Sequence, residues 1–198
     1  MRLTLSHIAA LAVLMATCLP APTWAHPHVW GQTVVTALVS GTQLLGYEVS
    51  WEFDEMYSES FMMEADTNRN GTLEAPEAQA IVHRVFVENP APLRQFFLVE
   101  TAGKKQPFKL AKPRIWVDDK KLLRYNFIVQ LNQPQPLETH HRFTVYDPEW
   151  YIEFIQEPQI KAPQNCISQL RPDTAISLYF DMVNPEVYSF ACGQAAKR

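Results

Sequence analysis

Oxygen-bearing side chains recur along the stretch 66–77, which reads D-T-N-R-N-G-T-L-E-A-P-E. Calcium takes about six to eight oxygen ligands, and a twelve-residue EF-hand loop supplies them from alternate positions around a sharp turn at a glycine. Gly71 stands at the turn position, and Glu77 at the last position offers two oxygens. The sequence therefore predicts a calcium loop. Its expected ligands are Asp66, Asn68, Asn70, Thr72 (through its backbone carbonyl), Glu74 and Glu77.

Helices are expected on both sides of this loop. Apolar residues at helical spacing predict an entering helix over 52–65 and an exiting helix over 75–88, with Pro76 in the first turn, where a missing N–H costs nothing. Because the loop has only three carboxylates and no second loop of this kind occurs, we expect weak binding, with a Kd on the order of 10⁻⁴ to 10⁻³ M. A calcium ion bound this weakly would have a structural role in the domain. The alternative is a solvated Asn/Gly turn that binds no ion.

Two histidines flank a proline at 26–28. Residues i and i+2 of an extended chain lie on one side, so His26 and His28 can together bind Zn²⁺, Ni²⁺, Co²⁺ or Cu²⁺. Pro27 has no amide N–H, which excludes the square-planar amino-terminal chelate of copper and nickel. The alternatives are a frayed polar terminus here and a plain β-turn at 146–149. Further donors to the histidine site are Asp147, His140 or His141.

The first 25 residues have the order of a secretory signal peptide, with Arg2, an apolar run over 8–19 and small residues before position 26. Cleavage after Ala25 makes His26 the first residue of the exported protein. Lipoprotein processing at Cys18 is the weaker alternative, because threonine precedes that cysteine where glycine or alanine is usual. The exported chain keeps Cys166 and Cys192, an even pair that predicts a disulfide in an oxidising compartment.

The remaining pattern is that of a β protein. Short alternating segments separated by turn residues predict a mainly antiparallel, sandwich-like domain over 26–198 with the helical EF-hand insert at about 52–89. A net charge of −4 and the absence of any basic run argue against a nucleic-acid partner. No glycine-rich phosphate loop and no G-x-S-x-G occurs, so no enzyme is indicated. Strands are expected at 29–39, 43–51, 96–100, 108–110, 114–117, 122–131, 142–146, 151–155 and 175–180.

Three further segments stand out: A-H-P-H-V-W at 25–30, W-E-F-D-E-M-Y-S at 51–58 and V-Y-D-P-E-W-Y at 145–151. Together with the loop at 66–77 they resemble a bacterial periplasmic family of unknown function. Its members are often described as the periplasmic component of an uncharacterised ABC-type transport system, and are often encoded beside, or fused to, nickel/cobalt-type membrane transporters. The resemblance implies an accessory role in zinc, nickel or cobalt traffic, with an inner-membrane metal transporter as partner. It implies no biochemical activity.

Three functions follow in order of preference. The first is a periplasmic protein that binds a divalent metal at His26 and His28 for a transporter, with calcium as a structural ion. The second is a calcium-stabilised interaction module of an envelope complex without metal traffic. The third is a copper enzyme with an N-terminal histidine, which would need a further histidine near His26.

Overall fold

The structure is a computed structural model that describes residues 27–163 and 165–193. The predicted signal peptide, Cys18 and His26 lie outside this part of the chain. The described strands are β1 (Val29–Ser40), β2 (Gln43–Phe53), β3 (Phe97–Thr101), β4 (Lys104–Lys105), β5 (Phe108–Val117), β6 (Leu123–Pro136), β7 (His141–Val145), β8 (Ile152–Gln156), β9 (Cys166–Pro172) and β10 (Glu186–Cys192). The helical elements are α2 (Glu55–Ala65), α3 (Ala75–Val82), the π-helical η1 (His83–Glu88) and α4 (Ala91–Arg94).

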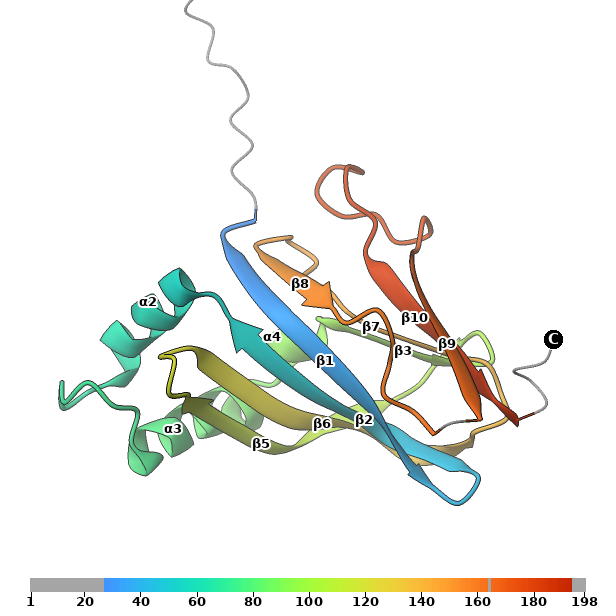
Figure 1. Ribbon diagram of the computed structural model, residues 1–198, viewed down its shortest axis with the longest axis horizontal. Helices are drawn as coiled ribbons and strands as arrows, with labels where there is room; N and C mark the ends of the chain where they lie inside the picture. Colours follow the sequence, from blue (N-terminus) through green and yellow to red (C-terminus); the bar gives the residue numbers. More distant parts are fainter. Residues whose placement is uncertain (1–26, 164, 194–198) are drawn as a thin grey trace, which may run out of the picture.

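The strands form two five-stranded sheets, with the orders β5-β6-β2-β1-β8 and β4-β3-β7-β10-β9. Figure 1 shows the helices α2 and α3 gathered at one end of the first sheet, where they connect β2 to the second sheet. This arrangement confirms a mainly β fold with a helical insertion between two groups of strands. The insert spans α2 to α4 and so reaches slightly beyond the predicted residue 89.

β1 and β2 form the long antiparallel hairpin at the centre of the first sheet. Gly41, with φ of 56°, lies at the turn, and the register pairs Gly31 with Phe53 at the open end of the hairpin. Buried and exposed residues alternate along β1, which is the pattern of a strand with one face in a core. Gly46 is required sterically, because a Cβ there would lie 2.3 Å from the carbonyl oxygen of Val129 in β6.

The other neighbour of β1 is β8, and the two strands run parallel. The sequence predicts antiparallel pairing, and this pair is the exception. Its cause is the crossover: the chain leaves β7 in one sheet, turns through 146–151 and enters β8 in the other sheet at the end where β1 begins. Val29 pairs with Ile152 in this register, so the loop before β8 lies beside the first described residues of the chain.

Aromatic side chains fill the space between the two sheets. Trp51 of β2 lies parallel to Phe97 of β3 with ring centroids 6.0 Å apart, and Tyr47 stacks on Phe143 of β7 at 4.1 Å. Burying a side chain of this size stabilises the fold by roughly 1.5–3 kcal/mol. These contacts join the central strand of the first sheet to the second sheet.

Most predicted strands are present, but the prediction of a strand at 175–180 is wrong. That segment belongs to a turn in which the consecutive residues Tyr179, Phe180 and Asp181 have φ of 47°, 58° and 64°, and three left-handed residues in a row do not form an extended strand. The predicted segments 108–110 and 114–117 are a single strand, β5, with an irregularity between Ala111 and Arg114. The strands β4, β9 and β10 were not predicted.

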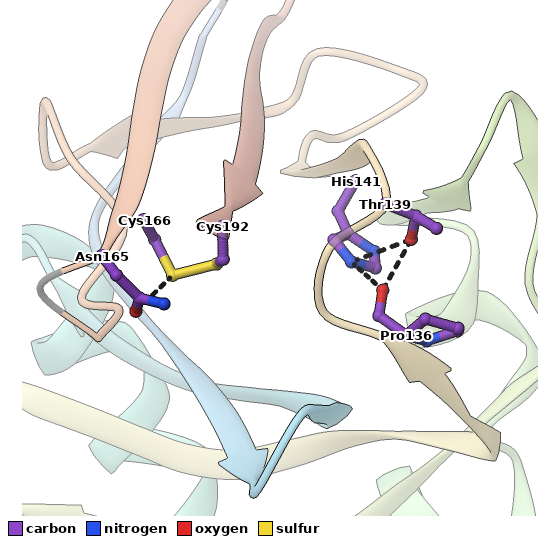
Figure 2. The surroundings of a disulfide bond; sticks show 6 residues. All are labelled: Pro136, Thr139, His141, Asn165, Cys166 and Cys192. Carbon is purple, nitrogen blue, oxygen red and sulfur yellow. Dashed lines mark hydrogen bonds between the residues drawn. A yellow bond between two sulfur atoms is a disulfide. The ribbon is translucent and has the colours of Figure 1, made fainter. Parts of the chain in front are cut away.

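The predicted disulfide is confirmed. Cys166 of β9 and Cys192 of β10 lie directly opposite each other in the antiparallel ladder, with a sulfur–sulfur distance of 2.00 Å. Figure 2 shows the bond beside Asn165, with His141 on a neighbouring segment. A disulfide of this kind agrees with an exported protein. Among the described residues, no helix combines the length and the apolar character needed to cross a bilayer.

Candidate functional site

Asp54 fixes the start of the helical insert. Its Oδ1 accepts a hydrogen bond from the Tyr57 N–H at 2.8 Å, so Asp54 is the N-cap of α2, and its Oδ2 accepts one from the Trp30 N–H at 2.8 Å. The entering helix therefore begins at Glu55 and not at the predicted residue 52, because residues up to Phe53 still pair with β1. One carboxylate ties the helix to the N-terminal segment.

The loop after α2 turns its side-chain oxygens toward its own backbone. The Asp66 carboxylate accepts from the N–H groups of Asn70 (3.1 Å) and Gly71 (2.7 Å), and Asn68 Oδ1 accepts from the same Asn70 N–H at 3.0 Å. Asn70 Oδ1 accepts from the Thr72 N–H at 2.9 Å. Gly71 has a φ of 79°, the left-handed conformation expected at the turn of a calcium loop. The oxygens predicted as the first ligands are thus gathered around one turn.

Glu77 closes the loop from the other side. Its Oε1 accepts from the Thr67 N–H at 2.7 Å, and its Oε2 accepts from the Glu74 N–H at 3.0 Å, as part of the capping box that begins α3. The Glu74 N–H bond, followed by the Thr67 hydroxyl, holds the pKa of Glu77 below its ordinary value. Asn68 Nδ2 donates to Glu74 Oε2 at 2.8 Å. The carboxylate at the last loop position is therefore ionised at neutral pH and lies against both ends of the loop.

The helix–loop–helix agrees with the prediction, with two qualifications. The exiting helix is α-helical only as far as Val82 and continues as the π-helix η1, in which His83 Nδ1 lies 3.2 Å from Glu88 Oε1. Within the described part of the chain, no group of three or more His, Cys, Asp or Glu side chains is arranged to hold a metal. The predicted calcium ligands also include asparagine and main-chain oxygens, which are donor types that calcium takes in proteins, and calcium binding here stays a prediction.

His28 is exposed and lies at the edge of a groove of about 400 Å³. Its N–H donates to the carbonyl oxygen of Tyr151 at 2.9 Å, and its ring lies 5.0 Å from the Tyr151 ring. One wall of the groove is α2, which contributes Tyr57 and Glu64. Burial, followed by the nearby Tyr151 and Glu64, raises the pKa of Tyr57. An imidazole, a carboxylate and two phenols thus line one groove, and of these only the imidazole was predicted as a site residue.

Asp147 is buried and holds the loop that carries Tyr151. Its Oδ1 accepts from the Glu149 N–H at 2.9 Å, and its Oδ2 accepts from the N–H groups of Tyr151 (3.0 Å) and Ile152 (2.9 Å). This is the turn with an Asx contact that the sequence left open as the alternative. Asp147 positions the residue against which His28 packs.

His141 lies elsewhere. It is fully buried, and its Nδ1 is 3.0 Å from the Thr101 hydroxyl. Its Nε2 is 3.2 Å from the Pro136 carbonyl oxygen (Figure 2). Burial lowers the pKa of His141 to about 4. Pro136 pairs with Gln43 at the start of β2, whereas His28 lies near the end of β2, roughly 30 Å away along the strand. The structure does not bring His141, or its exposed neighbour His140, to His28.

Comparison with known proteins gives a family. The family model described as "Protein of unknown function (DUF1007)" matches residues 11–182. The chain belongs to this family. No curated protein and no solved structure matches it. The DUF1007 match includes His28, the loop 66–77 and the turn held by Asp147, so all the candidate residues lie within it.

The three distinctive sequence segments of this DUF1007 chain, 25–30, 51–58 and 145–151, lie side by side in the structure. The N–H of Trp30, in the first segment, donates a hydrogen bond to Asp54 of the second. The N–H of His28, also in the first segment, donates a hydrogen bond to Tyr151 of the third. The groove beside His28 lies at this junction and contains Tyr57 of the second segment and Tyr151 of the third. Tyr57 and Tyr151 were therefore visible in the sequence as members of distinctive segments, whereas Glu64 had no such signal.

Proposed function

We propose that this chain is a periplasmic divalent-metal-binding accessory protein. It holds Zn²⁺, Ni²⁺ or Co²⁺ at its N-terminal histidines for an inner-membrane transporter and binds Ca²⁺ in the loop 66–77 as a structural ion. The observation that carries the proposal is the groove in which His28 lies opposite α2, the helix that leads directly into the loop.

The N-terminal site suits a metal that must be released. Imidazole nitrogen is a good ligand for zinc, nickel and cobalt, and His26 adds a second ring and, after cleavage, an amine. Glu64 can supply a carboxylate oxygen from the opposite wall of the groove. Few protein ligands and an exposed rim leave coordination positions open, through which a partner can take the metal.

Calcium has a supporting role in this scheme. The loop 66–77 follows α2 without an interval, so an ion bound there would hold the C-terminal end of α2 against α3. Since α2 forms a wall of the groove, calcium would keep Tyr57 and Glu64 in place opposite His28.

Titration calorimetry tests the transition-metal site. Zinc and nickel are titrated into the exported protein and into the His26→Ala/His28→Ala variant, and we expect the variant to lose affinity at least about tenfold, because both imidazoles are removed. His83→Ala, an exposed histidine in η1, is the matched control and should bind as the wild type does. Equal affinity in the double variant would refute the site.

The second candidate function is a calcium-stabilised interaction module. Met56 and Met63 of α2 are 63% and 79% exposed, an unusual placement for apolar side chains that suits a partner surface. Equal metal affinity of the His26→Ala/His28→Ala variant and the wild type would favour this second function over the first. A copper enzyme would need a further histidine at the N-terminal site, and the buried His141 lies far from His28.

A further inference from the structure

The outer edge of β8 has backbone groups without a strand partner. The Val29 N–H donates to the Tyr151 oxygen, and the Glu157 N–H donates to the Thr33 oxygen, so the odd-numbered residues of β8 direct their backbone toward β1. The backbone groups of the even-numbered residues, among them Phe154, therefore point the other way. Among the described residues β8 pairs only with β1, so this edge is open.

This edge faces a cleft. A cavity of about 210 Å³ is lined by β8, by the end of β7 and by the loop 173–185 that precedes β10. In Figure 1 that loop stands above β8 at the end of the molecule where β1 begins. Leu178 and Val183 supply apolar surface to the cleft, and Phe180, at 87% exposed, lies at the tip of the same loop. Gln156 and Glu186 also line the cleft, and the side-chain amide of Gln156 donates to the backbone carbonyl oxygen of Glu186 at 2.8 Å.

The charge around the cleft has one sign. Its lining includes the carboxylates of Asp147, Glu153 and Glu186 and no lysine or arginine. Asp147 is occupied by backbone donors, but Glu153 lies on the outer face of β8, in the position of a cross-strand neighbour to any strand added there. A second copy of β8 would bring its own Glu153 to this edge, and like charges on adjacent strands repel.

We propose that the edge of β8 binds an extended segment of a partner protein in which apolar residues alternate with lysine or arginine. The segment adds a strand to the first sheet through the backbone N–H and carbonyl of Phe154, because the Ile152 N–H already donates to Asp147. Its apolar side chains enter the cleft beside Leu178 and Val183, and its basic side chains lie on the outer face beside Glu153. This docking surface does not depend on either metal site.

Nuclear magnetic resonance with the peptide acetyl-Val-Lys-Val-Lys-Val-amide tests the proposal on the exported protein. We expect the exchange of the Phe154 amide hydrogen with solvent to slow at least about tenfold at saturating peptide, because that N–H gains a partner. The Ile155 amide, which already faces β1, should not change. Unchanged exchange at Phe154 in the presence of bound peptide would overturn the proposal.

Two N-methylated peptides test the strand geometry without altering the protein. One peptide is methylated on the valines and the other on the lysines, and only one of these two sets of N–H groups can face β8. Methylation of the set that faces β8 should therefore lower the binding affinity at least about tenfold, whereas methylation of the other set should change it little. Glu153→Lys should also weaken binding, with the exposed Glu138→Lys as the matched control. Equal binding of both methylated peptides would refute strand addition. So would protection of the Phe154 amide that rises with protein concentration alone, since the occupant would then be a second copy.

Discussion

Two aspartates organise the neighbourhood of His28. Asp54 accepts from the N–H groups of Trp30 and Tyr57, and Asp147 accepts from three N–H groups in the turn before β8. Neither side chain needs a metal to account for its contacts, because backbone donors occupy both of its oxygens. Their effect is to hold His28 and Tyr151 in register across segments that are distant in sequence.

His141 is a buried neutral base, and this predicts a specific pH dependence. Its pKa falls from 6.5 to about 4 in the folded protein because burial disfavours the charged form. Between these values the unfolded chain binds a proton that the folded chain does not, so the free energy of unfolding should fall as the pH drops through this range. The slope from this one residue is at most about 1.4 kcal/mol per pH unit.

Urea unfolding at pH values between 7 and 5 measures this slope. The His141→Gln variant should be less stable at neutral pH but should lose less stability on acidification, whereas His140→Gln should behave as the wild type. Parallel pH profiles for the wild type and His141→Gln would show that His141 is not the group responsible.

At the level of elements, local residue patterns in the sequence predicted the positions of most strands and helices. The alternation in β1 and β2 and the helical spacing on either side of 66–77 depend on neighbouring residues, and the hairpin and the two flanking helices are present where they were expected. The parallel direction of β8 could not be predicted, because it follows from a crossover between sheets and not from the sequence of the strand. At 175–180, the apolar residues Ile176 and Leu178 alternate with polar ones as in a strand, but they belong to a turn with three left-handed residues.

The same limit applies to the candidate site. The candidate ligands of the loop and His28 could be named from residue type and spacing, since donors close in sequence lie close in space. Glu64 and Tyr57 line the same groove as His28, and Asp54 anchors the helix that carries them against the start of β1. His141 looked like a candidate ligand in the sequence, and its burial beside Thr101 and Phe190 removes it.

The disulfide should stabilise the pair β9 and β10. It closes a stretch of 26 residues, and the loss of chain entropy in the unfolded state corresponds to about 3 kcal/mol. We therefore expect the Cys166→Ser/Cys192→Ser variant to lose about this amount in urea unfolding, and reduction of the wild type to have the same effect. A loss below about 1 kcal/mol in both experiments would show that the two strands do not need the bond.

At the scale of the whole molecule, the candidate functional residues gather at one end of the two-sheet structure. The start of β1, the turn before β8 and the helix α2 meet there, and the loop 66–77 continues from α2. The open edge of β8 and the loop 173–185 adjoin the same region. A metal held at His28, as proposed, and a partner strand on β8 would therefore lie close together.

Calcium binding by the loop 66–77 is the central claim, and the melting temperature of the exported protein in about 10 mM CaCl₂ against a chelator tests it most directly. For a Kd on the order of 10⁻⁴ to 10⁻³ M, we predict a rise of about 3 to 10 °C. Glu77→Gln should abolish this rise, whereas Glu59→Gln, an exposed glutamate of α2, should keep it. No rise in the wild type, or an equal rise in Glu77→Gln, would contradict the account.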